Sequence, residues 1–333
     1  MDVDEAAERL GFAGEAREWF RGVPEEGDVR APDEALLEFC GVGGEDRRDM
    51  LAARPDPVRE PEWWAITTAL AHGLERDMGK AVPSAGFQGW PAVPESAGEV
   101  GMFAGAWALL ANLPRLLELH AQRGVPQDVS VATASVLGGV LATHRQVTGR
   151  AGVGLFDLWG PPLRFRGADY EIGRHAFTRT QLGLGDGVAG HVLMMHIPPI
   201  GPLDAESSEQ SVRTALNSFQ RWYPEEPLTA IVCTSWLLDP QLGEYLRPDS
   251  NIMRFQQRFT MLPLVPPDDP NEGDRMFMGF GLQLAMPDGA IGAQELAQVP
   301  QDTTLQRAFV THLRSGRHWH KRTAILRSDL PWG

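Results

Sequence analysis

The stretch GHVLMMHIPPIGPLDAESSEQSVRTALNSFQRWYPEEPLTAIVCTSWLL, residues 190–238, carries the pattern that decides the fold. Its first residues belong to a strand predicted over 188–197, and the glycine and prolines that follow predict a loop. Residues 208–222 repeat apolar side chains at helical spacing, so they predict an amphipathic helix. Residues 228–238 are almost continuously apolar, which is typical of a buried strand. The stretch therefore predicts a strand, a loop, a helix that packs on the sheet, and a buried strand.

The flanking sequence adds further elements to this half of the chain. Gly and Pro turns separate three strand-like segments that precede it, at 153–158, 162–167 and 170–180. The elements expected after it are a short helix from Asp239-Pro240, a helix over 250–259, strands over 260–265 and 275–285, and a helix over 303–315 capped by Thr303 with Gln306. The order is several strands, a helix, a strand, further helices and a closing pair of strands, which indicates an α+β fold.

The first 150 residues are predicted to be helical. Residues 61–78 begin at Pro61 and place apolar side chains on one stripe, and residues 99–121 repeat that pattern. Pro114 lies inside the second segment, so a bent helix or a pair of helices is expected there. A third helix is expected over 128–147, and we expect no internal repeat. We therefore expect two domains, a helical one over 1–150 and a second one over 151–333.

Composition excludes several classes of function. The chain has 333 residues, of which 43% are apolar, and a net charge of −14. Such a charge repels nucleic acid and anionic lipid, so neither is an expected partner. The acidic amino terminus lacks the basic and apolar pattern of a secretory signal, and Cys40 and Cys233 are predicted to be unpaired buried thiols. We therefore expect a cytoplasmic protein, whose oligomeric state the sequence does not predict.

Three stretches of sequence point to a known family. The segments MHIPPIGPL, CTSWLLDPQLGEYLRPDSNIMRFQQRF and DTTLQRA resemble actinobacterial proteins that join an N-acyltransferase N-terminal domain to a GNAT-like C-terminal domain. The resemblance implies a mixed, mostly antiparallel sheet flanked by helices. It also implies an enzyme that moves an acyl group directly from acyl-CoA (acetyl-CoA or longer) to an amine of a small molecule, peptide or protein.

In the family, the loop after the fourth strand and the following helix N-terminus hold the CoA diphosphate through backbone N–H groups. The corresponding loop here is 197–207, where Gly201 alone matches the usual loop pattern, and Ser207 with Gln210 forms a capping-box pattern. The resemblance makes these residues the candidates for binding CoA: Met194, Met195, His196, Ile197, Ile200, Gly201, Leu203, Ser207 and Ser208. A rigid connector shaped by prolines is the alternative reading of this loop.

Acyl transfer to an amine also needs a group that takes a proton from the ammonium ion. His196 is the first candidate because it ends the predicted strand, whereas the odd spacing sends His191 to the opposite face. Glu171 and Ser235 are weaker candidates for catalysis. The family's proton-donating tyrosine is replaced by Phe255, which leaves Tyr245 as a substitute. For each of these residues, a structural hydrogen-bonding role is the alternative.

Other motifs give weaker indications. GDGVAG at 185–190 has dinucleotide-binding spacing, but the glycines lie between two predicted strands, where they favour a hairpin. His318 and His320 could begin a metal site, yet spacing shows no third ligand, so no metal is expected. Because a fold alone does not establish activity, a catalytically inactive GNAT-like binding or structural module remains the alternative to an enzyme.

Overall fold

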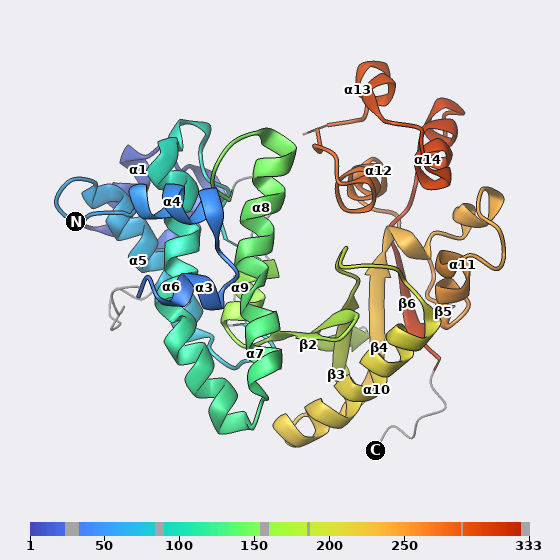
Figure 1. The fold of residues 1–333 in the computed structure, drawn as a ribbon, viewed down its shortest axis with the longest axis horizontal. Helices are drawn as coiled ribbons and strands as arrows, with labels where there is room; N and C mark the ends of the chain where they lie inside the picture. The colour runs from blue at the N-terminus through green and yellow to red at the C-terminus, as the bar shows by residue number, and fades with distance from the viewer. Residues whose placement is uncertain (24–32, 84–89, 154–159, 185–186, 288, 328–333) are drawn as a thin grey trace. The chain divides into compact units, whose positions relative to one another are not determined.

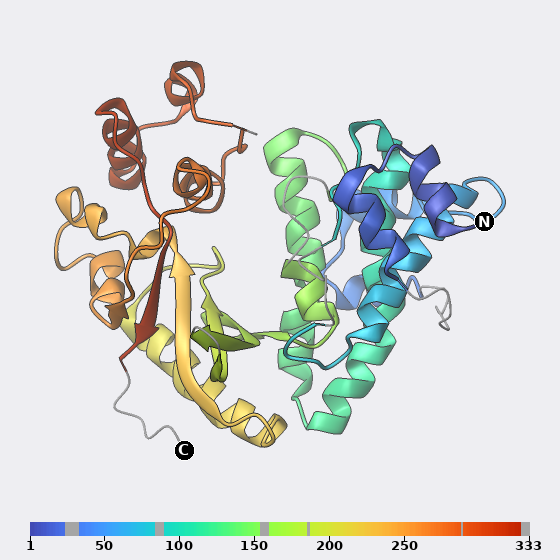
Figure 2. The same cartoon turned by 180° about the vertical axis from the view of Figure 1, so that it is seen from behind.

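The structure is a computed structural model that describes residues 1–23, 33–83, 90–153, 160–184, 187–287 and 289–327. It has an α+β fold and divides into two compact units, Met1–Glu171 and Ile172–Gly333 (Figures 1 and 2). The first unit is helical in its described part, and the second contains a sheet with helices. The strand predicted at 153–158 and part of the GDGVAG motif lie outside the described residues.

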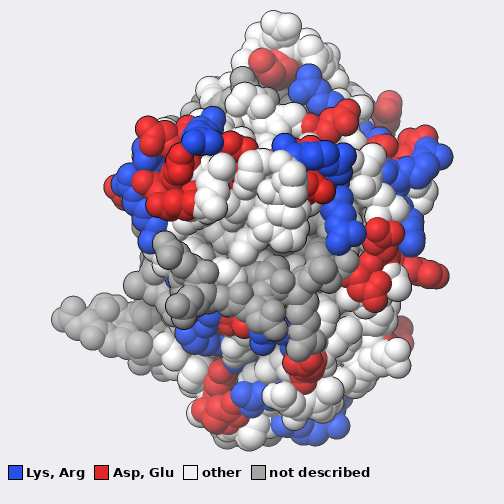
Figure 3. All heavy atoms as spheres, turned by 90° about the vertical axis from the view of Figure 1, so that its left-hand side faces the viewer, with Lys and Arg blue, Asp and Glu red and all other residues white. Residues whose placement is uncertain are grey.

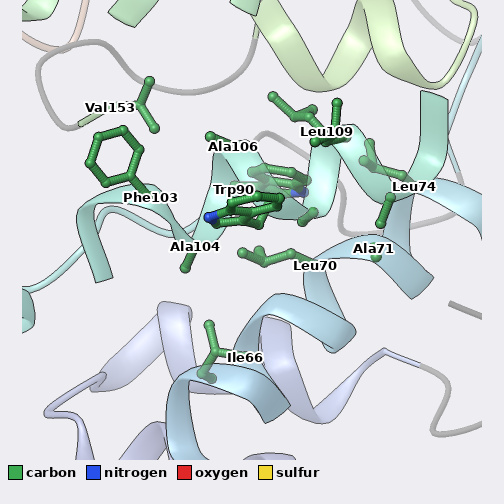
Figure 4. Packing of buried hydrophobic residues seen from close by; sticks show 14 of the residues in the cluster. Ile66, Leu70, Ala71, Leu74, Trp90, Phe103, Ala104, Ala106, Leu109 and Val153 are labelled. Carbon is green, nitrogen blue, oxygen red and sulfur yellow. The ribbon is translucent and has the colours of Figure 1, made fainter. Parts of the chain in front are cut away.

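The described part of the first unit consists mainly of helices. They are α1 (Val3–Arg9), α2 (Gly14–Arg21), α3 (Leu36–Phe39), α4 (Gly44–Ala52), α5 (Pro61–Arg76), η1 (Glu95–Ala97), α6 (Gly98–Arg123), α7 (Gln127–Ala134), α8 (Val136–Thr148) and α9 (Gly160–Phe165). The core forms mainly where α5 packs against α6. Figure 4 shows the buried Trp90 beside Leu70 of α5 and Ala104 and Ala106 of α6. This packing places the apolar stripes predicted from the sequence in the interior.

Helix α6 is the central element of this unit. It runs without a break through Pro114, so the predicted split into a pair of helices is wrong. Burial of residues such as Leu109 and Leu113, both fully buried, offsets the roughly 3 kcal/mol that an internal proline costs. The helix is also long and apolar enough to cross a membrane by length and composition, but 67% of its most apolar window is buried inside the protein. Its apolar surface therefore serves the packing of the core.

The N-terminal helices contain an internal repeat, which corrects the expectation that there is none. The hairpins α1–α2 and α3–α4 have the same design 30 residues apart (10–20 and 40–50). The helix ends at a glycine with positive φ, Gly11 (86°) or Gly41 (68°). The N–H of the next residue, Phe12 or Val42, then bonds the carbonyl five residues back at 2.9 Å in both copies. The sequence signal is weak because the glycines match while most of the other side chains differ.

Charged side chains of both signs are interspersed on the surface shown in Figure 3. In α1 and α2, for example, Asp4 accepts hydrogen bonds from Arg17 at 2.6 Å and from Arg21 at 2.9 Å. These two guanidinium groups lower the pKa of Asp4. The net charge of −14 therefore does not produce a continuous acidic patch on this face.

The second unit is built on one sheet with strand order β1-β2-β3-β4-β6-β5. Its strands are β1 (Asp169–Ile172, which begins in the first unit), β2 (His175–Leu184), β3 (Gly187–His196), β4 (Leu228–Ser235), β5 (Phe259–Met261) and β6 (Arg322–Leu326). The helices are α10 (Ala205–Trp222), η2 (Trp236–Leu238), η3 (Pro240–Glu244), α11 (Asn251–Gln256), α12 (Glu272–Met276), η4 (Phe277–Gly281), α13 (Ala293–Gln298) and α14 (Thr304–Arg314). Of the four strand pairs whose register is defined, β3–β4 alone is parallel.

Several predicted strands are wrong in detail. Residues 162–167 largely form α9, which begins at Gly160-Pro161-Pro162, where prolines suit the first turn of a helix. The predicted strand 170–180 is two strands, separated by Gly173 at φ 63°. Residues 275–285 form the end of α12 and the π-helical turn η4, and the strand that pairs with β5 is instead β6. The predicted helix 128–147 is two helices that meet at Ser135.

Two adjacent glycines of α8 allow a matched test of how closely this helix packs against the turn between α3 and α4. A Cβ atom at Gly138 would lie 2.2 Å from the backbone oxygen of Gly41, whereas a Cβ atom at Gly139 would meet nothing within 4 Å. We predict that Gly138→Ala lowers the free energy of unfolding by about 1–3 kcal/mol through overpacking. Gly139→Ala should raise it by about 0.5–1 kcal/mol because alanine loses less entropy in a helix. Urea denaturation measures both, and equal effects would contradict the close contact of α8 with the α3–α4 turn.

Candidate active site

The central feature of the second unit is the point where β3 and β4 stop pairing. The pairing of β3 with β2 runs to Ala176↔His196, at the last residue of the strand. In the described residues of both strands, β3 pairs with β4 from His191↔Leu228 to Met194↔Val232 and no further. Strand β4 continues to Ser235, paired with β6. Beyond Met194, β3 is therefore no longer paired with β4, and backbone groups at an edge where a ladder ends can bind a ligand.

The two histidines of β3 point to opposite faces of the sheet. Arg179, which is in register with Leu193, packs its guanidinium 3.3 Å from the ring centre of Tyr223, the residue that follows α10. Odd-numbered residues of β3 therefore face α10, and His191 lies 3.9 Å from Glu226 on that side. His196 is on the other face, where its Nε2 lies 2.8 Å from Thr178 Oγ1. The threonine fixes the orientation of the half-buried imidazole.

Arg174, a residue that the sequence analysis missed, holds the loop after β3. Its guanidinium donates to three backbone oxygens of this loop, Pro198 at 2.7 Å and Gly201 and Pro202 at 2.9 Å. The loop has few backbone donors of its own because three of its residues are prolines. The guanidinium satisfies carbonyl groups that water or ladder bonds would otherwise satisfy. A single arginine in a turn carries no sequence pattern that could have predicted this role.

The N-terminus of α10 is capped differently from the prediction. The cap is Asp204 rather than Ser207, and its Oδ1 accepts the backbone N–H of Ser207 at 2.8 Å. Hydrogen bonds from the Ser207 hydroxyl and N–H lower the pKa of Asp204. The carboxylate of Asp204 therefore already interacts with the positive end of the α10 helix dipole. An anionic ligand at this terminus needs additional positive charge.

Five of the nine predicted CoA-binding residues line two hollows beside the first turns of α10. Ile200, Gly201 and Ser207 line a cavity of about 510 Å³ that also touches Arg174. Leu203 and Ser208 line a smaller groove with Arg254 and Arg258. Met194, Met195 and His196 are on β3, and Ile197 begins the loop. The loop and the first turn of α10 thus gather most of the predicted residues, and two arginines that the sequence analysis missed flank the groove.

A buried polar network lies beneath that groove. Ser208 is 1% exposed, and its Oγ lies 2.7 Å from His175 Nε2 and accepts from Arg258 at 2.8 Å. Burial and the nearby Arg174 and Arg258 lower the pKa of His175 to about 3. His175 is therefore neutral at physiological pH. Ser208 connects His175 of β2 to Arg258, which lies between α11 and β5. Ser208 is thus a structural hydrogen-bonding residue in the described network.

The other catalytic candidates have structural partners. Ser235 caps η2 by accepting the N–H of Leu237 at 3.1 Å. Glu171 belongs to the first unit, where its carboxylate lies 2.7 Å from Arg164. The hydroxyl of Tyr245 lies 3.0 Å from His312 Nδ1. None of these contacts brings Ser235 or Tyr245 to His196.

Metal ligands do not gather in the part of the chain that is described. No group of three His, Cys, Asp or Glu side chains there could hold a metal ion. His318 instead bonds Asp274 through Nδ1 at 2.7 Å. Both cysteines are buried, and burial raises the pKa of each thiol to about 12, which leaves them unreactive.

Comparisons with known proteins agree with this geometry. Residues 31–167 match the N-acyltransferase N-terminal domain, and residues 170–326 match the GNAT-like C-terminal domain. Solved structures similar to the chain are an acyltransferase in complex with CoA and 10C-teicoplanin (31% identity, TM-score 0.85), an acyltransferase in complex with decanoyl-CoA (33%, 0.83) and an acyltransferase mutant in complex with octanoyl-CoA (31%, 0.85). Each match covers 98% of this chain and 99% of the other.

The chain belongs to the GNAT-like acyltransferase family. The predicted family and the α+β fold class are therefore confirmed. No curated protein sequence matches the chain. For a GNAT-like acyltransferase, the separation of β3 from β4 and the loop clamped by Arg174 are the features from which a mechanism can be derived.

The low pKa of His175 predicts how stability depends on pH. Between pH 6.5 and about 3, the unfolded chain binds a proton at this histidine and the folded protein does not. The free energy of unfolding should therefore fall as the pH falls below 6.5, by at most about 1.4 kcal/mol per pH unit for this group. His175→Gln should flatten this slope, whereas Ser208→Ala should keep it. Urea denaturation between pH 7 and 5 measures the slopes, and equal slopes for wild type and His175→Gln would contradict the burial of a neutral imidazole.

Proposed function

We propose that this GNAT-like acyltransferase transfers an acyl group from acyl-CoA directly to an amine of a small molecule or peptide. The observation that carries the proposal is the end of β3–β4 pairing at Met194↔Val232, next to the loop that leads to the N-terminus of α10. The solved relatives that bind CoA, octanoyl-CoA and decanoyl-CoA support the donor, and the relative that binds 10C-teicoplanin supports a peptide-like acceptor.

The donor would bind from the side of α10. Its thioester would lie in the opening between the strands, where the carbonyl oxygen accepts backbone N–H groups of β3 beyond Met194. The diphosphate would lie at the first turn of α10, between the two hollows. Because prolines remove donors there and Asp204 adds negative charge, we assign the compensating positive charge to Arg254, which is exposed, and to Arg258.

The reaction would proceed by direct attack on the thioester. The amine nitrogen forms a bond to the carbonyl carbon, the carbon–sulfur bond breaks, and CoA leaves as a thiolate. We assign the proton lost from the amine to the imidazole of His196, because Thr178 holds this ring through Nε2 on the face opposite α10. The proton then neutralises the thiolate directly or through water. No covalent acyl-enzyme is required, so the structural roles of Ser235 and Ser208 are compatible with this mechanism.

The preferred acyl group should be longer than acetyl. The similar structures that hold an acyl-CoA hold chains of eight or ten carbons, as their names state. We propose octanoyl-CoA or decanoyl-CoA as the better donors and acetyl-CoA as the weaker one.

A catalytically inactive binding module is the second candidate. Asp204 at the helix N-terminus and the prolines of the loop favour it because both weaken a diphosphate site. A module with such a weakened site would not be stabilised by CoA or acyl-CoA and would release no thiol from acyl-CoA in the presence of amines.

Binding of CoA is the first prediction. CoA at 100 times its dissociation constant should stabilise the protein by about 2.7 kcal/mol, seen as a higher melting temperature. Arg254→Ala should weaken CoA binding several-fold and reduce its dependence on salt, because one charge near the diphosphate is lost. Arg213→Ala, an exposed arginine further along α10, is the matched control and should leave binding unchanged. If neither CoA nor octanoyl-CoA stabilises the protein, the proposed donor is wrong.

Turnover and its pH dependence are the second prediction. With octanoyl-CoA and a primary amine such as unacylated teicoplanin, thiol release should accompany a mass increase of one octanoyl group on the acceptor. His196→Gln should lower kcat about 10²–10⁴-fold and remove the decline of kcat at low pH, while CoA binding is retained. Thr178→Val should lower kcat less and keep the pH profile. A His196→Gln variant with wild-type kcat would contradict the assignment of the base.

A further inference from the structure

Trp236 continues the face of the sheet that carries His196. Ser235 has an extended backbone (φ −157°, ψ 151°), so the side chain that follows it points to the opposite face. Thr234, on the same side as Trp236, contacts Thr323 at 2.9 Å and shares the face of Met194. Trp236 therefore lies at the carboxyl end of β4, on the side of the sheet away from α10.

An unusual turn packs on this tryptophan. The ring of Phe277 stacks on Trp236 with 4.1 Å between centroids and 17° between planes. A Cβ atom at Gly281, at the end of η4, would lie 2.6 Å from Trp236. Gln283, two residues further on, has φ 55°, a left-handed conformation that non-glycine residues rarely adopt. Isolated π-helical turns such as η4 occur often at functional sites.

The turn is fixed at the end of the sheet rather than over its middle. Figures 1 and 2 both place α12, which leads into η4, beyond the carboxyl end of β4. Lys321, just before β6, pairs with Glu272 of α12 at 2.5 Å. The turn also presents Phe280, which is 43% exposed. The buried Trp236 thus lies at the end of the strand that the donor site uses, and the turn that packs on it carries the exposed Phe280.

We propose that Trp236 and η4 form the acceptor side of the active site, with Phe280 as a residue that determines acceptor specificity. The inference rests on the proposed function. If CoA enters from the side of α10, the amine must enter from the other face, where His196 and Trp236 lie. Phe280 contacts an aromatic or other flat apolar group of the acceptor next to its amine, through ring packing and cation–π attraction to the ammonium ion. Alkylamines lack such a group and bind more weakly.

Titration calorimetry with the CoA-saturated protein tests this inference with simple amines. Phenethylamine should bind at least about threefold more tightly than hexylamine. Phe280→Ala should remove that preference, and Gly281→Ala, whose added Cβ displaces Trp236, should reduce it. Leu264→Ala is the matched control because Leu264 is 41% exposed elsewhere in the same unit, and it should leave the preference unchanged. All three variants should bind CoA as the wild type does.

The outcomes separate the two proposals. If CoA itself fails to bind the wild type, the proposed function is wrong and the acceptor site is rejected with it. If CoA binds but phenethylamine shows no preference over hexylamine, the acceptor site is overturned while the donor site stands. The same holds if Phe280→Ala and Leu264→Ala behave alike. A melting curve of each variant shows that the loss of preference does not arise from unfolding.

Discussion

The parallel ladder between β3 and β4 ends at Met194↔Val232, and the rest of the active-site account depends on this constraint. Each strand continues past that point on its other side, with β2 or with β6, so the sheet remains stable while one inner edge becomes available. A backbone group that loses a ladder partner inside a protein must find another partner. A thioester carbonyl is such a partner, which is why an opening within a sheet can serve catalysis.

The two faces of the sheet differ in the side chains that surround the end of the β3–β4 ladder. On the side of α10, Arg174 fixes the shape of a loop that is poor in donors, and Arg254 and Arg258 supply positive charge near a helix start capped by Asp204. On the other side, Thr178 orients His196 without adding charge. Transfer from an anionic donor to an amine requires positive charge for the diphosphate, here on one face of the sheet, and an oriented base, here on the other.

The elements nearest the site were predictable because their signals are local. The apolar run of β4, the amphipathic stripe of α10 and the capping box of Thr303 with Gln306 each depend on a few neighbouring residues. Helix α9 and η4 were predicted as strands because short apolar runs do not distinguish the two periods. The roles of Arg174 and Trp236 depend on partners distant in sequence or on a strand's face, and no local pattern shows either. The N-cap is Asp204 rather than Ser207 because both residues are favourable caps and Asp204 directly precedes the first helical turn, a choice that propensity alone does not settle.

The most direct measurement is a crystal structure with a non-reactive analogue of octanoyl-CoA that keeps the carbonyl group and carries a methylene group between the sulfur and the carbonyl carbon. The account predicts that the carbonyl oxygen of the analogue accepts a backbone N–H of β3 beyond Met194, that the diphosphate lies at the first turn of α10, and that His196 faces the carbonyl carbon from the opposite side. An analogue bound elsewhere, or β3 and β4 paired through to Ser235 in its presence, would contradict the account.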